Sequence, residues 1–372
     1  MSESLDSLYS VARRTIWLAL LLWLPVSPAA AQQLNMVSWG GAYTRSQILA
    51  FVRPYEAGTG VRINMEDYNG GLAELRSQVR SLNFRWDVID LELSDAIRGC
   101  AEGLLEPIPI DALAPPPGGG AVMDDFLPGS LTDCAVGTVI WSTVIAYDRE
   151  ALSGEAPDSL EDFFDVERFP GARGLRRTPR ANLEWALIAD GVAQQRVYDV
   201  LETSEGVERA LRVLDRIKPA LVWWEAGIDA PRLLETGRVV MTSSYNGRVH
   251  DAAVGRNQPL EIIWDHQVWN IDLLGIPRGN PRREQALEFI RFATATEQLA
   301  EQARHIPYGP VRRSALAQLD PQLGSSLPTA PENFATALQI NSRWWAEHHE
   351  RINKRFEEWL QQPVRVPRRL PR

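Results

Sequence analysis

Hydrophobic positions in the first third of the chain switch between two spacings. Short strand-like segments at 34–38, 61–65 and 86–93 alternate with apolar stripes at helical spacing at 48–55 and 72–82. Glycines separate several of these segments, as expected where helices and strands end. Strands separated by helices of this length usually pair in parallel, so the pattern predicts an α/β layered lobe.

The rest of the chain continues the mixed pattern. Residues 136–147 predict a strong strand that could cross between two lobes, and 159–242 repeat the α/β texture. A further strand is expected at 271–276, followed by a helix around 286–293, and 333–360 predict a helical end rich in tryptophan. The sequence contains no repeat of fixed period.

The N-terminus has the layout of a secretory signal peptide. Arg13 and Arg14 precede an apolar run at 16–26, and Ala29 to Ala31 supply small residues for cleavage. The run is shorter than the roughly 20 residues that span a bilayer. We therefore expect residues 1–31 to be removed and the chain to be exported to the periplasm.

Length and charge narrow the class of protein. The remaining ~340 residues exceed a usual single core, which predicts two lobes. The formal net charge of −9 argues against a nucleic-acid partner, because phosphate binding needs a basic face. The two cysteines, Cys100 and Cys134, predict one disulfide in an oxidising compartment, with two buried free thiols as the alternative.

Motifs for catalysis are missing from the sequence. It has no His-Glu-x-x-His zinc helix, no Gly-x-Ser-x-Gly elbow and no phosphate-binding Gly-x-x-x-x-Gly-Lys loop. Its five histidines are scattered, and the neighbours His348 and His349 would not share a helix face. We expect no enzyme activity, no cofactor and no metal site.

Aromatic and acidic residues at strand ends suggest a binding site instead. Trp39 follows the first predicted strand and Glu92 lies at the end of the third, where open parallel sheets bind ligands. An aromatic face with a carboxylate suits a cation, although ordinary packing would also explain Trp39. If residues 223–225 form a strand, Trp223 and Glu225 share one face of it.

Several strings, taken in order, resemble one family. They are Ser38-Trp39-Gly40-Gly41-Ala42-Tyr43, FVRPYEAGTG from Phe51, Trp86-Asp87-Val88, GLLEPIP from Gly103, Tyr245-Asn246-Gly247, IDLLGIP from Ile271, ALEFIRFATA from Ala286 and Ile306-Pro307-Tyr308. Together they resemble the extracellular solute-binding proteins of ABC importers, most closely the spermidine/putrescine-binding group, over nearly all of the chain after the signal peptide.

The resemblance implies a two-lobe periplasmic binding-protein fold of type II, with mainly parallel sheets and hinge strands. Lobe 1 would contain 32–142 and 268–309, and lobe 2 would contain 143–267 and 310–372. It implies a monomer that clamps a polyamine-like cation between its lobes and delivers it to ABC permease subunits. A zwitterion, a thiamine-like cation or iron held by tyrosines are alternative ligands, and a periplasmic enzyme or a sensor subunit are alternative functions.

The resemblance also assigns candidate ligand contacts. Trp39 and Tyr43 match an aromatic pair, Glu184 matches a carboxylate of lobe 2, and Glu92 is acidic where the group has a small polar residue. Arg248 departs from the pattern, because it would repel an ammonium and favours a ligand that also carries an acidic group. The predicted ligand-binding residues are Trp39, Tyr43, Glu92, Glu184, Trp223, Glu225, Tyr245, Trp269, Asp272 and Tyr308.

Overall fold

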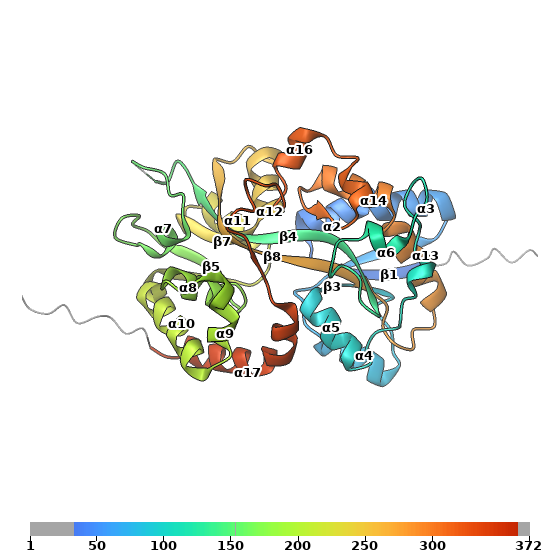
Figure 1. Ribbon diagram of the computed structural model, residues 1–372, viewed down its shortest axis with the longest axis horizontal. Helices are drawn as coiled ribbons and strands as arrows, with labels where there is room; N and C mark the ends of the chain where they lie inside the picture. The colour runs from blue at the N-terminus through green and yellow to red at the C-terminus, as the bar shows by residue number, and fades with distance from the viewer. Residues whose placement is uncertain (1–32, 153, 364–372) are drawn as a thin grey trace, which may run out of the picture.

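The computed structural model describes residues 33–152 and 154–363. The predicted signal peptide at 1–31 lies outside these residues. Figure 1 shows two masses of helix and sheet on either side of a long central pair of strands. Among the described residues, no helix is long and apolar enough to cross a membrane.

The described strands join in one sheet of ten. Their bounds are β1 Gln33–Ser38, β2 Arg62–Asp67, β3 Val88–Glu92, β4 Ala135–Asp148, β5 Arg173–Arg176, β6 Leu221–Trp224, β7 Met241–Tyr245, β8 Leu260–Gly275, β9 Gly309–Pro310 and β10 Leu338–Gln339. The main path runs β2-β1-β3-β8-β4-β7-β5-β6. Pairing is parallel within β2-β1-β3 and within β7-β5-β6, and antiparallel where β4 and β8 join these two groups.

The long strands β4 and β8 belong to both lobes. Val136 and Ile140 of β4 pack in one hydrophobic core, whereas Ile145 and Tyr147 of the same strand pack in another. The two strands pair along most of their length, with register shifts between Gly137 and Val139 and between Thr143 and Ile145. Such irregularities increase local bending, which suits a pair of strands that connects two lobes.

Helices cover both faces of the sheet. They are α2 Gly41–Gln47, α3 Arg53–Thr59, α4 Ala73–Ser81, α5 Leu93–Ala101, α6 Val122–Asp125, α7 Leu160–Phe164, α8 Asn182–Ala189, α9 Val197–Leu201, α10 Ser204–Ile217, α11 Asp229–Glu235, α12 Asn246–His250, α13 Arg283–Ala293, α14 Thr296–His305, α15 Arg313–Leu316, α16 Pro321–Ser325 and α17 Ser342–Leu360. A π-helical turn at Ile48–Val52 joins α2 to α3.

Two large cores define the lobes. We call lobe 1 the part that packs around β1, β2, β3 and the end of β8, and lobe 2 the part that packs around β5, β6 and β7. Val311 and Ala315, which the predicted division placed in lobe 2, pack in the core of lobe 1. The reason is that α15 packs on α14, which covers the same core.

The early alternation of strands and helices agrees with the predicted pattern, whereas two later elements differ. The strand expected at 271–276 begins at Leu260 and has 16 residues. The C-terminal helix begins only at Ser342, after Asn341 caps it by accepting a hydrogen bond from the Trp344 backbone N–H. Helix α17 belongs to the core of lobe 2 but also packs against α5 of lobe 1 (Figure 1).

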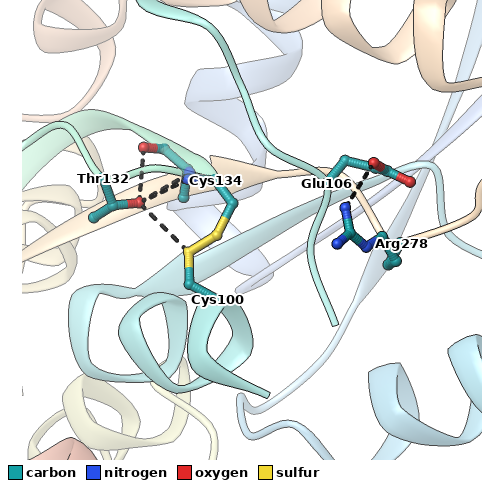
Figure 2. Close-up of a disulfide and its surroundings, with 6 residues drawn as sticks. Cys100, Glu106, Thr132, Cys134 and Arg278 are labelled. Atoms are coloured by element: carbon teal, nitrogen blue, oxygen red, sulfur yellow. Dashed lines mark hydrogen bonds and ion pairs between the residues drawn. A yellow bond between two sulfur atoms is a disulfide. The ribbon is translucent and has the colours of Figure 1, made fainter. Parts of the chain in front are cut away.

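Cys100 and Cys134 form the predicted disulfide, with their Cα atoms 6.0 Å apart. Figure 2 shows the bond joining the end of α5 to the residue just before β4. Thr132 accepts a hydrogen bond from the Ala135 backbone N–H and donates one to the Ala135 carbonyl, which secures the turn beside it. The disulfide therefore attaches α5 directly to a strand that leads into the other lobe.

Candidate functional site

A small cavity of about 30 Å³ lies where the two lobes meet, at the ends of their strands. Its lining comes from lobe 1, from lobe 2 and from the two connecting strands. The lining residues are Trp39, Tyr43, Asn69, Glu92, Trp141, Arg176, Gly227, Tyr245, Arg248, Asp272 and Tyr308. Glu92, Arg176 and Tyr245 are the last residues of β3, β5 and β7, and such strand ends are where open α/β sheets bind ligands.

The lobe 1 wall contains a group of three buried carboxylates. Glu92 and Asp272 stand directly opposite each other where β3 pairs with β8, and Asp90 lies two residues before Glu92 on the same face. Each of these three residues is at most 5% exposed to solvent. The pairing register therefore brings together negative charges that are far apart in the sequence.

Neutral donors hold two of these carboxylates. Asp90 accepts hydrogen bonds from the Trp39 indole at 3.2 Å and the Gln47 amide at 2.6 Å, and Asp272 accepts one from the Trp141 indole at 2.7 Å. The arginines that reach this wall pair with Glu92 instead. Among the described residues, Asp90 and Asp272 thus form a buried acidic pair without a basic partner.

The missing countercharge affects the protonation of both groups. Burial raises the pKa of Asp90 from 3.8 to about 7, although its hydrogen bonds to Gln47, Tyr43 and Trp39 oppose that rise. Burial, and then the charges of Asp90 and Glu92, raise the pKa of Asp272 well above its ordinary value. A cation placed between these two groups would favour their charged forms.

The lobe 2 wall carries the opposite charge. Arg248, in α12, is 5% exposed and its guanidinium carbon lies 5.9 Å from the centre of the Tyr245 ring. Arg176, at the end of β5, lies 5.8 Å from the same ring centre. The two guanidinium groups therefore lie near one aromatic side chain that lines the cavity.

Arg248 also reaches across to lobe 1. Its Nη1 donates to the Gly40 carbonyl at 3.1 Å and its Nη2 donates to the Trp39 carbonyl at 2.9 Å, whereas its Nε–H is buried with no partner in the described part of the chain. A Cβ added at Gly227 would lie 2.6 Å from that Nε, so glycine is required for the guanidinium to sit there. Arg248 therefore connects the lobes and keeps one donor free at the cavity.

Ion pairs beside the cavity join the lobes as well. Glu92 pairs with Arg180 through a very short contact, and with Arg176 at 3.5 Å. Arg180 also contacts Asp95 at 3.4 Å. Because these arginines belong to lobe 2 and the carboxylates to lobe 1, the contacts favour the closed arrangement of the lobes.

Aromatic rings enclose the space between the acidic and basic groups. Trp141 and Tyr245 pack edge to face with their ring centres 5.0 Å apart, and the Tyr43 and Tyr308 ring centres are 5.6 Å apart. Such rings offer apolar surface for an alkyl chain and attract cations through their faces. The arrangement can hold a short chain with a positive group at one end and a negative group at the other.

Six predicted residues meet at this cavity: Trp39, Tyr43, Glu92, Tyr245, Asp272 and Tyr308. Two others pack elsewhere in the lobes. Glu184 lies in lobe 2, where its Oε1 accepts hydrogen bonds from the Tyr198 hydroxyl at 2.9 Å and the Trp345 indole at 2.7 Å. Trp269 packs against Phe334, with ring centres 5.7 Å apart.

The two tryptophans of β6 face the opposite sides of the sheet from those predicted. Trp223 packs edge to face on Phe356 and Trp359 of α17, whereas Trp224 is buried near Tyr245. Glu225, with 69% of its side chain exposed, lies at the rim of a neighbouring compartment. The C-terminal helix covers the face that carries Trp223, which periodicity within β6 could not reveal.

The sequence interpretation missed four lining residues, Asn69, Trp141, Arg176 and Gly227. It also missed Asp90, which lies behind the lining and accepts a hydrogen bond from the Trp39 indole. Asp90 had a signal, because a carboxylate within the apolar strand Val88–Glu92 shares the face of Glu92. Trp141 had no distinguishing signal, because an aromatic residue in a buried strand is usually core. Arg176 ends a strand of four residues that is too short to recognise by its pattern.

Metal binding has no support among the described residues, where no group of three or more His, Cys, Asp or Glu side chains could hold an ion. Tyr43, Tyr245 and Tyr308 do meet at the cavity, as a tyrosine-based iron site would require. However, the pKa of each hydroxyl is raised, and burial is the largest cause of that rise. Phenolates, the form that binds iron, are thereby disfavoured.

Comparison with known proteins gives consistent matches. The family model described as bacterial extracellular solute-binding protein matches residues 50–334. A γ-aminobutyric acid-binding protein from Pseudomonas aeruginosa is 37% identical over 339 residues, which is 91% of this chain and 94% of that protein. The predicted resemblance to the extracellular solute-binding proteins is confirmed.

Solved structures agree on the fold. The binding protein MotA from A. tumefaciens B6, in complex with glucopine, is 28% identical with a TM-score of 0.81, covering 88% of this chain and all of that one. A γ-aminobutyric acid (GABA) receptor is 26% identical with a TM-score of 0.77, covering 90% of this chain and all of that one. The predicted periplasmic binding-protein fold is confirmed, whereas the predicted polyamine ligand gains no specific support.

Proposed function

This chain belongs to the bacterial extracellular solute-binding proteins, and we propose that it is the periplasmic receptor of an ABC importer for a small zwitterion of the γ-aminobutyrate type. The ligand would be an ω-amino acid, with an ammonium at one end of a short alkyl chain and a carboxylate at the other.

The observation that carries this proposal is the pair of unlike walls in one cavity. The ligand ammonium would lie between Asp90 and Asp272, supplying the positive charge that these buried carboxylates lack. The ligand carboxylate would accept hydrogen bonds from Arg176 and from the free Nε–H of Arg248. Trp39, Tyr43, Trp141, Tyr245 and Tyr308 would enclose the chain between these ends.

A zwitterion fits this charge pattern better than a polyamine does. A diamine would satisfy the acidic wall, but its second ammonium would face Arg176 and Arg248, whose charges repel it. We therefore replace the polyamine expected from the sequence with an amino acid. The names of two relatives, a γ-aminobutyric acid-binding protein and a GABA receptor, support the same choice.

Ligand binding would select the closed lobes. Because the ligand touches carboxylates of lobe 1 and guanidinium groups of lobe 2, it binds the closed form more tightly than the open one. Arg248 adds to this effect, because the side chain proposed to hold the ligand carboxylate also donates to two lobe 1 carbonyls. The closed form would then dock on the permease subunits of the importer.

Calorimetric titration of ligand-free protein tests the proposal with two ligands that differ at one end. γ-Aminobutyrate and putrescine both have four carbons, but putrescine has an aminomethyl group in place of the carboxylate. We expect γ-aminobutyrate to bind at least tenfold more tightly, and to stabilise the fold by about 2.7 kcal/mol at 100 times its dissociation constant. Tighter binding of putrescine or spermidine would overturn the assignment of the basic wall.

A further inference from the structure

A second compartment adjoins the ligand cavity on the side of the basic wall. It measures about 300 Å³ and is bounded by Asn69, Gly71, Arg177, Arg180 and His349, among others. Four residues, Trp39, Asn69, Glu92 and Arg176, line both this outer compartment and the inner cavity. The two spaces are therefore neighbours that share a wall, and Arg176 belongs to both.

The outer compartment has hydrogen-bond donors to spare. Among the described residues, the Nε–H of Arg180 is buried without a partner, whereas its Nη groups donate to Glu92, Asp95 and His349. The hydrogen bonds of Arg176 are long, at 3.5 Å to Glu92 and 3.4 Å to the Asn69 carbonyl. A buried guanidinium donor without an acceptor is costly, so these groups favour a ligand that brings one.

His349 does not supply a further positive charge. Burial, and then the nearby Arg180, lower the pKa of His349 to about 4, so the ring is neutral at neutral pH. Glu225 lies at the rim with most of its side chain in solvent. The hydrogen-bond donors that remain available in this compartment therefore belong to Arg176 and Arg180. Such donors suit a carboxylate or another strong acceptor.

The two ends of the proposed ligand differ in their surroundings. The ammonium end would face Asp90 and Asp272, which are at most 4% exposed and lie on the paired strands β3 and β8. The carboxylate end would lie at Arg176, on the wall shared with the outer compartment. A longer ligand would therefore extend from its carboxyl end into the outer compartment.

We propose that the outer compartment is a second subsite, which holds a terminal acceptor group of a ligand longer than a simple ω-amino acid. The ligand class is an ω-aminoacyl conjugate. Its ammonium lies at Asp90 and Asp272, its internal carbonyl lies at Arg176 and Arg248, and its terminal carboxylate lies at Arg180. This assignment rests on the proposed function, because it keeps the same ammonium site and the same orientation.

Three probes of graded structure test the subsite by calorimetric titration. They are γ-aminobutyrate, γ-aminobutyryl-glycine and N-ethyl-4-aminobutyramide, which has the amide of the second probe but ends in a methyl group instead of a carboxylate. We expect γ-aminobutyryl-glycine to bind at least tenfold more tightly than the ethylamide, because only its carboxylate can use the donors of the outer compartment.

The variant Arg180→Lys identifies the donor. Lysine keeps a positive charge for Glu92 and Asp95 but lacks the Nε–H in the guanidinium plane. In this variant we expect the preference for the glycine conjugate over the ethylamide to fall to about threefold or less. A role in lobe closure alone would weaken both ligands equally and leave their ratio unchanged, which would overturn the assignment of Arg180.

The outcomes separate this inference from the proposed function. If γ-aminobutyrate binds but the glycine conjugate gains nothing over the ethylamide, the outer subsite is wrong and the inner site stands. If none of the three probes binds, the proposed function fails as well. The comparison of probes on the unaltered protein decides the subsite even if the variant does not fold.

Discussion

The two walls of the interlobe cavity differ in the sign of the charge that they leave without an ionic partner. On the lobe 1 side, Asp90 and Asp272 have uncharged hydrogen-bond donors and no ion pair among the described residues. On the lobe 2 side, Arg248 has only backbone carbonyl acceptors. Neither wall is electrostatically complete by itself, and a ligand with two opposite charges would complete both.

A second contrast lies between two buried carboxylates. Asp272 and Glu184 are each at most 4% exposed, and each accepts a hydrogen bond from a tryptophan indole. Glu184 has further support from the Tyr198 hydroxyl within lobe 2, whereas Asp272 lines the cavity beside two other carboxylates. Burial alone therefore does not mark a ligand-binding carboxylate, and its place relative to the cleft does.

The largest effect on binding should come from Asp272→Asn. Removing the charge would leave the ligand ammonium partly unpaired in a buried site, and breaking such a pair costs about 2–5 kcal/mol. We expect ligand affinity to fall roughly 30-fold or more, with each 1.4 kcal/mol worth a factor of ten. Calorimetric titration against γ-aminobutyrate measures this change, and circular dichroism checks that the variant is folded.

Glu184→Gln is the matched control for Asp272→Asn. It removes one buried carboxylate charge in the core of lobe 2, so it should alter the free energy of unfolding and leave the dissociation constant within about threefold. Equal losses of affinity in the two variants would abolish the contrast between these carboxylates, and would return Glu184 to the ligand-binding set predicted from the sequence.

A somewhat smaller loss is expected for Arg248→Gln. This change removes the charge at the basic wall that would hold the ligand carboxylate, and one hydrogen bond to a charged group contributes about 1.5–3 kcal/mol. We expect affinity for γ-aminobutyrate to fall about 10- to 30-fold while putrescine is weakened little or binds better. A loss that is the same for both ligands would contradict a carboxylate contact at Arg248.

The acidic wall should make binding depend on pH. The pKa of Asp90 is about 7 without ligand, because burial disfavours its charge, and the ligand ammonium stays protonated well above that pH. Affinity should therefore rise by up to about tenfold between pH 6 and pH 8, as Asp90 loses its proton. Titrations across this range measure the effect, and Asp90→Asn should flatten it.

The same shift predicts the opposite trend for the stability of the ligand-free protein. A carboxyl whose pKa is raised on folding contributes stability below its unfolded pKa near 4, and that contribution is lost as the pH rises to about 7. Thermal unfolding without ligand should show this decline, and a saturating amount of γ-aminobutyrate should reduce it. An increase in stability over this range in the wild type, with no change in Asp90→Asn, would contradict the assigned pKa.

The smallest effect should come from an interlobe contact at the rim. Arg45 of lobe 1 forms an ion pair with Asp251 of lobe 2, but 59% of the arginine side chain is exposed to solvent. Exposed pairs contribute little, so Arg45→Gln should change affinity by about twofold at most, and less at high salt. A larger change would mean that closure depends on the rim as well as on the cavity walls.

The sequence alone was sufficient for the fold class, the family and the disulfide. The alternation of β1, α2, α3, β2, α4 and β3 can be read from apolar spacing, because helices and strands bury their side chains with different periods. Trp39 and Glu92 could be placed near a cleft because each lies at the carboxyl end of a parallel strand. The ordered strings that resemble solute-binding proteins contain Tyr43, Tyr245, Asp272 and Tyr308, and the structure places all four at the same cavity.

Only the tertiary structure decided the charge pattern of the site. Asp90 and Asp272 come together through the register of β3 against β8, and Arg176 meets the cavity because β5 pairs with β7 in lobe 2. Glu184 and Trp223 lie elsewhere because α17, over 100 residues later, packs against both. Local periodicity reports which face of an element is buried, whereas the identity of its partner depends on contacts between distant segments of the chain.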